Sequence, residues 1–292
     1  MRNILFLLIF LFGIENGSLF AAGESPSYYR MFKGRPAKFD WVKCSLSGGL
    51  ILGSVSAVYL STRDIYYNEP TVKFHFARHS NGSLKWFENK FRGMDKFGHI
   101  FSGSLYTQNI YFLARWSGME HKSASYAAFW GSFTVMSAME VHDAFYERWG
   151  FSLGDFTANL IGAVYPLIQQ NSQFFQAIDY KFSYHLPILF SHQEDIDDYE
   201  NMTFWLTLHP GGLFSEKLPG WFPKFLNVAV GVVLSHYPRR QREIYLSLDY
   251  NLKYFRAKSL FLSYLLAMLD RFHLPAPAIR ITPTVITYGL FF

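Results

Sequence analysis

The stretch DKFGHIFSGSLYTQNIYFLA at residues 95–114 decides the fold, because apart from its first two residues and His99 it carries no formal charge. Its apolar and small residues predict one helix over about 96–115. Its length is close to the roughly 17–25 residues that cross a bilayer. Asp95 and His99 are four residues apart, so a helix would place both on one face.

Three further helical candidates lie around this stretch, and they predict a helical core over 41–184. The first contains Gly48, Gly49 and Gly53, small residues that permit close helix contacts, as in membrane bundles. We therefore expect a mainly α fold, a membrane-associated helical bundle; a tightly packed globular bundle is the alternative. The candidates cover residues 41–59, 123–148 and 153–169.

The N-terminus reads as a signal peptide over 1–22, followed by an N-terminal lead over 23–40. Arg2 precedes the apolar run Ile4–Ile14, and small residues at 21–23 offer a cleavage site. An uncleaved anchor is the alternative. These features predict a bacterial cell-envelope protein that is membrane-associated, in the periplasm or outer membrane.

The composition points to a lipid partner. Only 17% of the residues are charged, half are apolar, and the net charge of +5 suits an anionic membrane surface. The basic residues are scattered and no recognition motif is present, so a nucleic-acid partner is not expected.

A smaller α+β segment over 185–292, ending in a β-strand, is expected to follow the core. Strand-like runs lie at 203–208, 226–235 and 243–252, and one helix is expected at 257–272. The final run, 284–292, resembles the C-terminal assembly signal of outer-membrane barrel proteins. Four or five strands are too few for a closed membrane barrel, so an ordinary last strand is the alternative.

Polar residues occur in pairs on three of the apolar helices. Asp95 and His99 form the first pair, Glu140 and Asp143 the second, and Asp155 and Asn159 the third. If the three faces converge, these residues and Lys96 meet at one site. The expected catalytic residues are His99, Glu140 and Asp155, and the supporting polar cluster is Asp95, Lys96, Asp143 and Asn159.

Two kinds of chemistry suit such a cluster. A buried carboxyl group with a raised pKa can act as general acid or base beside His99. A His with carboxylates can instead bind a divalent metal as cofactor, for which His99, Glu140 and Asp143 are the candidate ligands. No motif selects one metal, and its identity stays unknown.

Each residue also has a structural explanation. Asp95 can cap the start of its helix, and Ser152 with Asp155 forms a capping-box pattern. Glu140 follows an uncharged run inside a helix, so capping does not explain it. A buried ion pair is its structural alternative.

The assembled motifs resemble the YfiM-like family of predicted periplasmic lipoproteins of uncharacterised function. The motifs are DKFGH at 95–99, EVHD at 140–143, WGFSLGD at 149–155 and ANLIG at 158–162. Their order is also similar to the helical motif core of VanZ-like membrane proteins. The resemblance implies an envelope location and a shared polar core, but no reaction. The chain departs from the lipoprotein label because its one Cys, Cys44, lies away from the expected cleavage site.

We therefore expect an envelope protein of uncharacterised activity. One hypothesis is a hydrolase or transferase acting on a lipid or lipid-linked substrate. The alternative is a non-catalytic outer-membrane or periplasmic scaffold, or a lipid-binding protein, in which the polar cluster is structural.

Overall fold

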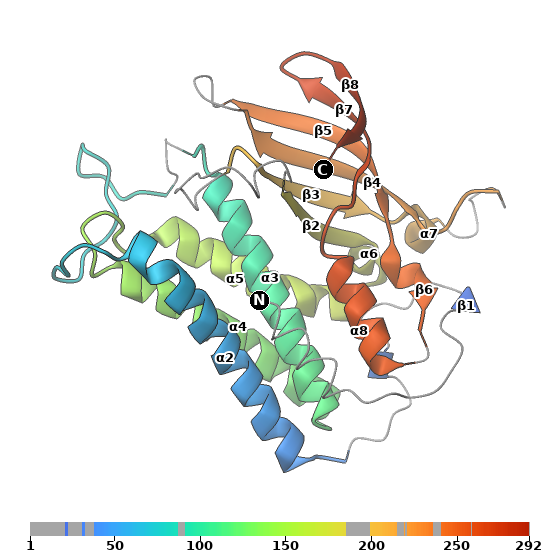
Figure 1. Cartoon of the computed structure of the whole chain (residues 1–292), viewed down its shortest axis with the longest axis horizontal. Helices are drawn as coiled ribbons and strands as arrows, with labels where there is room; N and C mark the ends of the chain where they lie inside the picture. Colours follow the sequence, from blue (N-terminus) through green and yellow to red (C-terminus); the bar gives the residue numbers. More distant parts are fainter. Residues whose placement is uncertain are drawn as a thin grey trace.

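Four long helices lie on one side of the molecule and a curved antiparallel sheet on the other (Figure 1). This is the architecture of the computed structural model. The model describes residues 21–22, 31–32, 38–86, 91–184, 199–214, 219, 221–235, 241–257 and 259–291. Most of the predicted signal peptide and N-terminal lead therefore lies outside the described residues.

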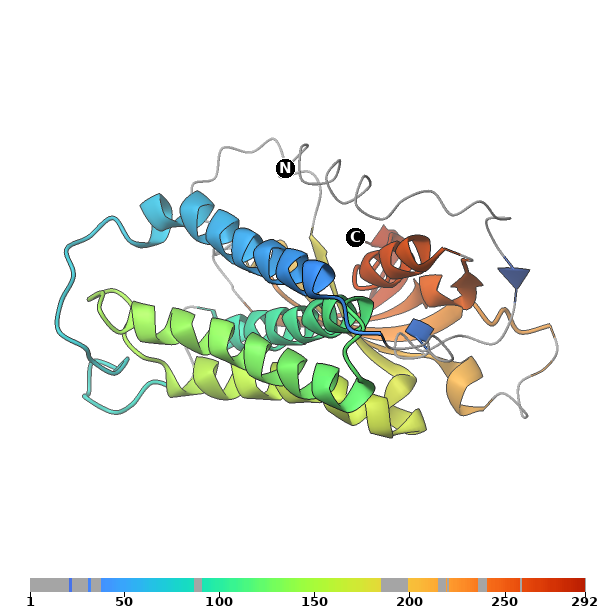
Figure 2. The ribbon, with the colours of Figure 1, turned by 90° about the horizontal axis from the view of Figure 1, so that it is seen from below.

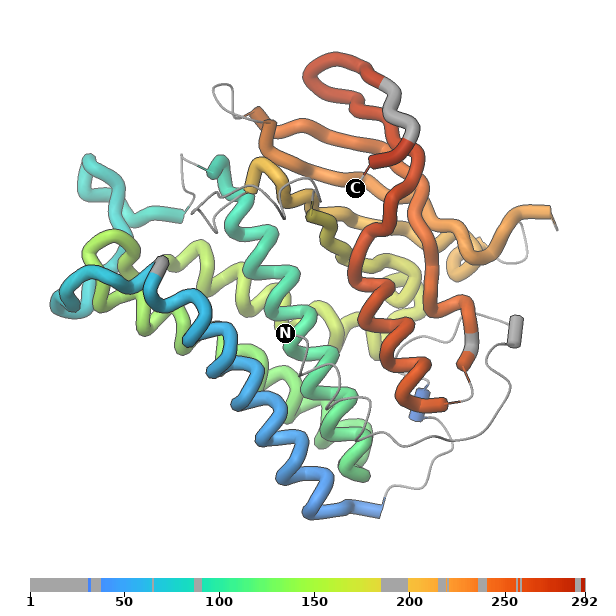
Figure 3. Tube along the Cα trace, viewed as in Figure 1, coloured from blue at the N-terminus to red at the C-terminus, as the bar shows by residue number. Residues whose placement is uncertain are grey.

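The four helices predicted from the sequence are confirmed, with somewhat different ends. Helix α3 lies between α2 and the α4–α5 pair (Figure 2). The four helices are α2 (Trp41–Tyr66), α3 (Met94–Trp116), α4 (His121–Asp143) and α5 (Leu153–Asn171). The short helix α6 (Gln173–Gln176) continues α5, and the chain can be followed through it into the sheet in Figure 3.

Helices α3 and α5 approach each other closely because glycines face the contact. A Cβ added at Gly162 would lie 2.5 Å from the carbonyl oxygen of Ile100, and one at Gly103 would lie 3.1 Å from that of Asn159. A side chain at either position would push the helices apart. This approach brings the polar residues at the N-terminal ends of α3 and α5 within reach of each other.

The sheet has six antiparallel strands in the order β2-β3-β4-β5-β7-β8. They are β2 (Ile178–Tyr184), β3 (Met202–Leu208), β4 (Leu226–Leu234), β5 (Arg242–Tyr250), β7 (Ala276–Thr282) and β8 (Ile286–Phe291). The two-residue strands β1 (Ala21–Ala22) and β6 (Phe255–Arg256) pair separately. The remaining elements are helix α7 (Pro210–Leu213), a 3₁₀ turn at Leu252–Tyr254 and helix α8 (Leu260–Leu269).

One face of the sheet, here called the inner face, is polar and buried. Trp205 lies on it, wholly buried, and stacks on His273 with ring centroids 3.9 Å apart. The residues of this face alternate along the strands with apolar residues that point the other way. Its buried polar members include Asp179, Lys181, Ser183, Thr203, Thr207, Asn227, Ser247 and Asp249.

An ionic network, here called the sheet network, joins the inner face to the end of α8. The ammonium group of Lys181 lies 2.7 Å from Asp249 and 3.1 Å from Asp270. Lys253 contacts both Asp179 and Asp270. With Arg271, which donates to Ser104 of α3 at 3.0 Å, the network holds three acidic and three basic side chains. These formal charges cancel.

The expected fold class, a mainly α membrane-associated helical bundle with a smaller C-terminal α+β segment, is wrong. A six-stranded antiparallel sheet forms a second layer beside the helices, although the helices hold more of the residues. Among the described helices, only α2, over Trp41–Asp64, is long and apolar enough to cross a membrane. The helices containing residues 97–114, 123–139 and 156–171 do not reach that hydropathy.

Two strands of the six-stranded sheet, β2 and β7, were not predicted from the sequence. Each omission has a physical reason. Strand β2 carries Asp179 and Lys181 beside aromatic residues, and it follows directly on a helix, so no turn signal separates the two. Strand β7 contains Pro277, which lacks an N–H for the ladder. An irregularity in the β7–β8 pairing between Ala276 and Ala278 accommodates this proline.

Candidate functional site

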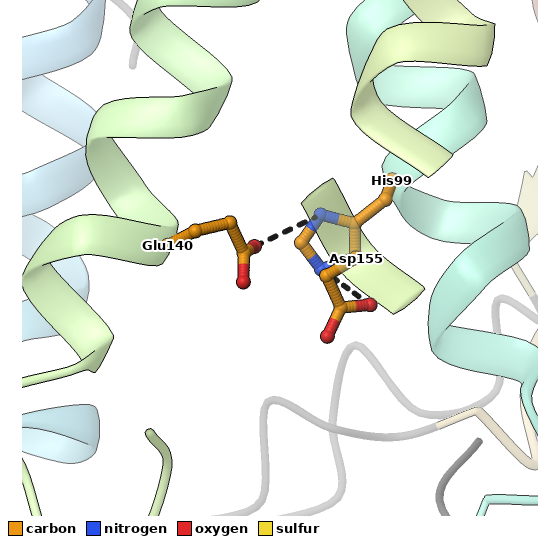
Figure 4. A group of neighbouring side chains, drawn as sticks. All are labelled: His99, Glu140 and Asp155. Atoms are coloured by element: carbon orange, nitrogen blue, oxygen red, sulfur yellow. Dashed lines mark ion pairs between the residues drawn. The ribbon is translucent and has the colours of Figure 1, made fainter. Parts of the chain in front are cut away.

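Three helices each contribute one side chain to a cluster of possible ligand atoms. His99 comes from α3, Glu140 from α4 and Asp155 from α5, and one ligand atom of each lies within 4.8 Å of the others. Figure 4 shows the ring of His99 between the two carboxyl groups. The sequence predicted this convergence from the three polar pairs.

The imidazole of His99 faces a different acid with each nitrogen. Its Nδ1 lies 3.6 Å from Oε1 of Glu140, and its Nε2 lies 3.5 Å from Oδ1 of Asp155. The His99 side chain is 22% exposed, whereas that of Glu140 is 2% exposed. A ligand can therefore reach the ring more easily than it can reach Glu140.

Asn159 determines which nitrogen of His99 carries the proton. Its amide nitrogen donates to the carbonyl oxygen of Met136 at 3.2 Å, and this leaves Oδ1 to face His99. Since that oxygen can only accept, the 2.9 Å contact with Nδ1 requires an Nδ1–H donor. In the neutral ring Nε2 then holds the lone pair, and in the charged ring its N–H faces Oδ1 of Asp155.

Glu140 is protonated at neutral pH. Burial, together with Asp155 and Asp143, raises the pKa of its carboxyl group to about 9. The backbone N–H of Ser152 donates to this carboxyl group, but Oε1 is buried without a hydrogen bond. A buried acceptor without a donor is costly, so this atom is suited to a ligand, a proton or a cation.

Asp155 is ionised and paired with Lys96. The Lys96 ammonium donates to Asp155 at 2.7 Å and to Asp95 at 2.6 Å. Burial alone would raise the pKa of Asp155, but His99 and Lys96 more than offset this and lower it. Burial would lower the pKa of Lys96, and Asp155 and Asp95 reverse that effect too, so the ammonium stays charged.

Asp143 lies beside this cluster and is engaged elsewhere. The hydroxyl of Tyr67, which follows α2, donates to Oδ1 of Asp143 at 2.6 Å. Burial and the charge of Asp143 raise the pKa of Tyr67 well above its usual range. The structure therefore groups Asp155 with His99 and Glu140 as possible metal ligands, in a position that the sequence assigned to Asp143.

The predicted caps have different outcomes. Ser152 is the N-cap of α5, and its hydroxyl accepts from the backbone N–H of Asp155 at 3.2 Å, as predicted. At the start of α3 the N-cap position belongs to Gly93, with φ of 74°, and Asp95 lies in the first turn. An acidic residue in the first turn interacts favourably with the helix dipole. The carboxylate of Asp95 accepts a hydrogen bond from Lys96 rather than capping the helix.

Sequence reasoning missed Tyr67 and the whole sheet network. Tyr67 lies just after a helix whose end was expected at residue 59, so no pattern joined it to Asp143. A signal for the network exists in β2, where Asp179, Lys181 and Ser183 are spaced by two. That spacing places polar residues on one face of a strand, but only the partner strands show that this face is buried.

The cluster can perform two kinds of chemistry. When its ring is neutral, His99 can accept a proton at Nε2, and the neutral Glu140 can donate one, a pairing suited to general acid–base catalysis. One imidazole nitrogen and two carboxylate oxygens are also a donor set that binds divalent zinc, manganese or iron. The unpaired Oε1 of Glu140 is compatible with either use.

Residues 84–171 match the model of a family described as "Predicted periplasmic lipoprotein (DUF2279)". The matched segment contains His99, Glu140 and Asp155. No curated protein and no solved structure matches the chain. The family match confirms the predicted location, so the chain is a protein of the bacterial cell envelope. The resemblance to a predicted periplasmic lipoprotein family is likewise confirmed over these residues, whereas the likenesses to the YfiM-like family by name and to VanZ-like proteins stay predictions.

Proposed function

We propose that the protein is a cell-envelope hydrolase or transferase, and that His99, Glu140 and Asp155 are its catalytic residues. One observation carries the proposal: Nε2 of His99, which holds the lone pair when the ring is neutral, faces Asp155 at 3.5 Å, while a neutral Glu140 lies 3.6 Å from Nδ1. A base and an acid with different protonation states are thus held side by side.

The roles follow from the contacts. His99 removes a proton from the attacking hydroxyl or water through Nε2. Asn159 orients the ring and is a positioning residue. Glu140 donates a proton to the leaving group, and Asp155, held by Lys96, stabilises the positive imidazolium that forms.

A lipid or lipid-linked compound is the proposed substrate class. The envelope location supports it, as does α2, whose apolar window is only 6% buried. The resemblance to VanZ-like membrane proteins agrees with this class, and an outer-membrane position would bring the site to such substrates.

A turnover assay tests the proposal. Purified protein is incubated with total envelope lipid extract, with and without added zinc or manganese, and products are followed by mass spectrometry. The wild type should convert at least one lipid species, and His99→Ala and Glu140→Gln should lower the rate by about a hundredfold or more.

The matched control is Thr157→Ala, an exposed change on α5 between Asp155 and Asn159. It should keep full activity, and all variants should keep the wild-type melting temperature within a few degrees. If no lipid species changes under any of these conditions, the polar cluster is structural and the scaffold alternative stands.

A further inference from the structure

The apolar face of the sheet carries an aliphatic surface that no described element covers. Helix α3 packs on one part of this face, where Phe97 contacts Phe204 and Phe101 contacts Phe182. The rest is open, and its side chains are between 38% and 53% exposed. The aliphatic face consists of Leu206, Val228, Val230, Leu246, Leu248 and Ile279.

Strand register makes these residues one continuous surface. Leu206 pairs with Val230, Val230 with Leu246, and Leu246 with Ile279, so one row crosses four strands. Val228 pairs with Leu248 in the next row. Directly paired residues of antiparallel strands lie on the same side, with Cβ atoms about 5 Å apart.

The polarity of this sheet is the reverse of that expected in water. A half-exposed antiparallel sheet normally turns its apolar residues inward and its polar residues outward. Here Lys181 and Asp249 are wholly buried on the inner face. The residues that alternate with such polar residues along the strands, such as Leu246 and Leu248, are aliphatic and partly exposed on the other face. Apolar residues outside and polar residues inside are the pattern of strands that face hydrocarbon.

Basic residues lie at both ends of the aliphatic face, and a tryptophan lies at one of them. At one end, just before β4, Trp221 is 81% exposed and Lys224 is exposed. At the other end, Arg242 begins β5 and is exposed. Tryptophan and basic residues are enriched where proteins meet the membrane–water interface, and the basic ends complement anionic headgroups.

We propose that the aliphatic face inserts into the hydrocarbon of one membrane leaflet. Along β5 the aliphatic run from Ile244 to Leu248 is about 13 Å long, at roughly 3.3 Å per residue. A hydrocarbon core is about 30 Å thick, so the face is too short to span the bilayer. With basic residues at both of its ends, the face lies flat against one leaflet. The aliphatic face holds no Tyr, Trp, Met or Arg, the residues enriched in protein–protein interfaces. This inference does not depend on the proposed catalytic activity.

Spin labels on single cysteines test the proposal in the full chain. Cys44→Ser provides the background, and labels are placed through Val230→Cys on the aliphatic face and Lys224→Cys at its edge. A label at Asn81→Cys, in an exposed turn far from the sheet, is the control. The protein is bound to vesicles of phosphatidylethanolamine with a minority of phosphatidylglycerol.

The label at position 230 should collide readily with oxygen and be protected from a water-soluble nickel complex by tenfold or more relative to position 81. The label at position 224 should give an intermediate value. Because α2 could hold the protein on a vesicle by itself, binding alone is not the readout. Free nickel access at position 230 would overturn the proposal. Spin–spin broadening there would overturn it too, because it would show a second copy of the chain covering the face.

Discussion

The protein contains two buried polar clusters, and they differ in charge balance and in exposure. In the sheet network, three basic and three acidic side chains lie at the inner face of the sheet, with Lys181 and Asp249 fully buried. In the cluster around His99, one ammonium group serves two carboxylates, a third carboxyl group is kept neutral, and the imidazole is partly exposed. The charges of the first cluster cancel out of reach of solvent, whereas the second holds a neutral acid beside a partly exposed imidazole.

The difference separates structure from candidate chemistry. Some polar atoms of the sheet network also make no hydrogen bond among the described residues, such as Oδ1 of Asp249 and Nη1 of Arg271. Its formal charges balance, however, and these side chains are not exposed to a ligand. In the His99 cluster, the buried Oε1 of Glu140 makes no hydrogen bond, which is energetically costly. A substrate, a proton or a cation bound there can offset that cost. Variants in the sheet network should therefore change mainly the free energy of unfolding. Variants in the cluster around His99 should change mainly the protonation of its side chains.

The largest effect on stability is expected from Lys181→Met. It leaves Asp249 and Asp270 buried without their shared ammonium group, so the free energy of unfolding should fall by about 3–5 kcal/mol. Urea unfolding at neutral pH measures it. As a control, Arg63→Met removes an exposed pair with Asp64 and should cost less than about 1 kcal/mol. Equal losses of unfolding free energy in Lys181→Met and Arg63→Met would mean that the buried sheet network stabilises the fold no more than an exposed ion pair does.

A second effect concerns the pH dependence of stability. The carboxyl group of Glu140 titrates near pH 4.5 when unfolded and near about 9 when folded, so between these values only the folded state holds this proton. The free energy of unfolding should therefore fall with rising pH, by up to about 1.4 kcal/mol per pH unit from this group.

Glu140→Gln removes that slope, so the variant should gain stability relative to the wild type as the pH rises from 6 to 8. At pH 6 the exchange is between two neutral groups of similar shape and should change stability little. Glu147→Gln, an exposed change just beyond α4, should leave the slope as it is. Parallel curves for Glu140→Gln and the wild type would show that Glu140 is ionised in the folded protein.

The smallest effect is expected from Asn159→Leu, which removes the acceptor that holds the Nδ1–H form of His99. Stability should fall by about 1–2 kcal/mol, because Asn159 is fully buried and also donates to Met136. Nitrogen-15 shifts of the His99 ring should change from one tautomer to a mixture, while those of His121 stay constant. Unchanged His99 shifts would mean that another group sets the tautomer.

The sequence predicted the helical layer and the members of its polar cluster better than it predicted the sheet. Asp95 with His99, and Asp155 with Asn159, are separated by one helical turn, so local spacing alone places each pair on one face. The inner face of the sheet depends on partners far apart in the chain, such as Lys181 with Asp249 and Asp270. No local pattern reveals such a pairing, and the proline in β7 conceals the strand that completes it.

Helix α3 links the two regions physically. Phe97 and Phe101, two residues before and after His99, rest on aromatic residues of the sheet, and Ser104 accepts from Arg271 of the sheet network. A rigid helix transmits a displacement along its length, so a tilt of the sheet at a membrane can move the imidazole relative to Glu140. Because a shift of about 1 Å can change a reaction rate by about a hundredfold, contact of the aliphatic face with a membrane can control the rate at a catalytic site that lies away from that face.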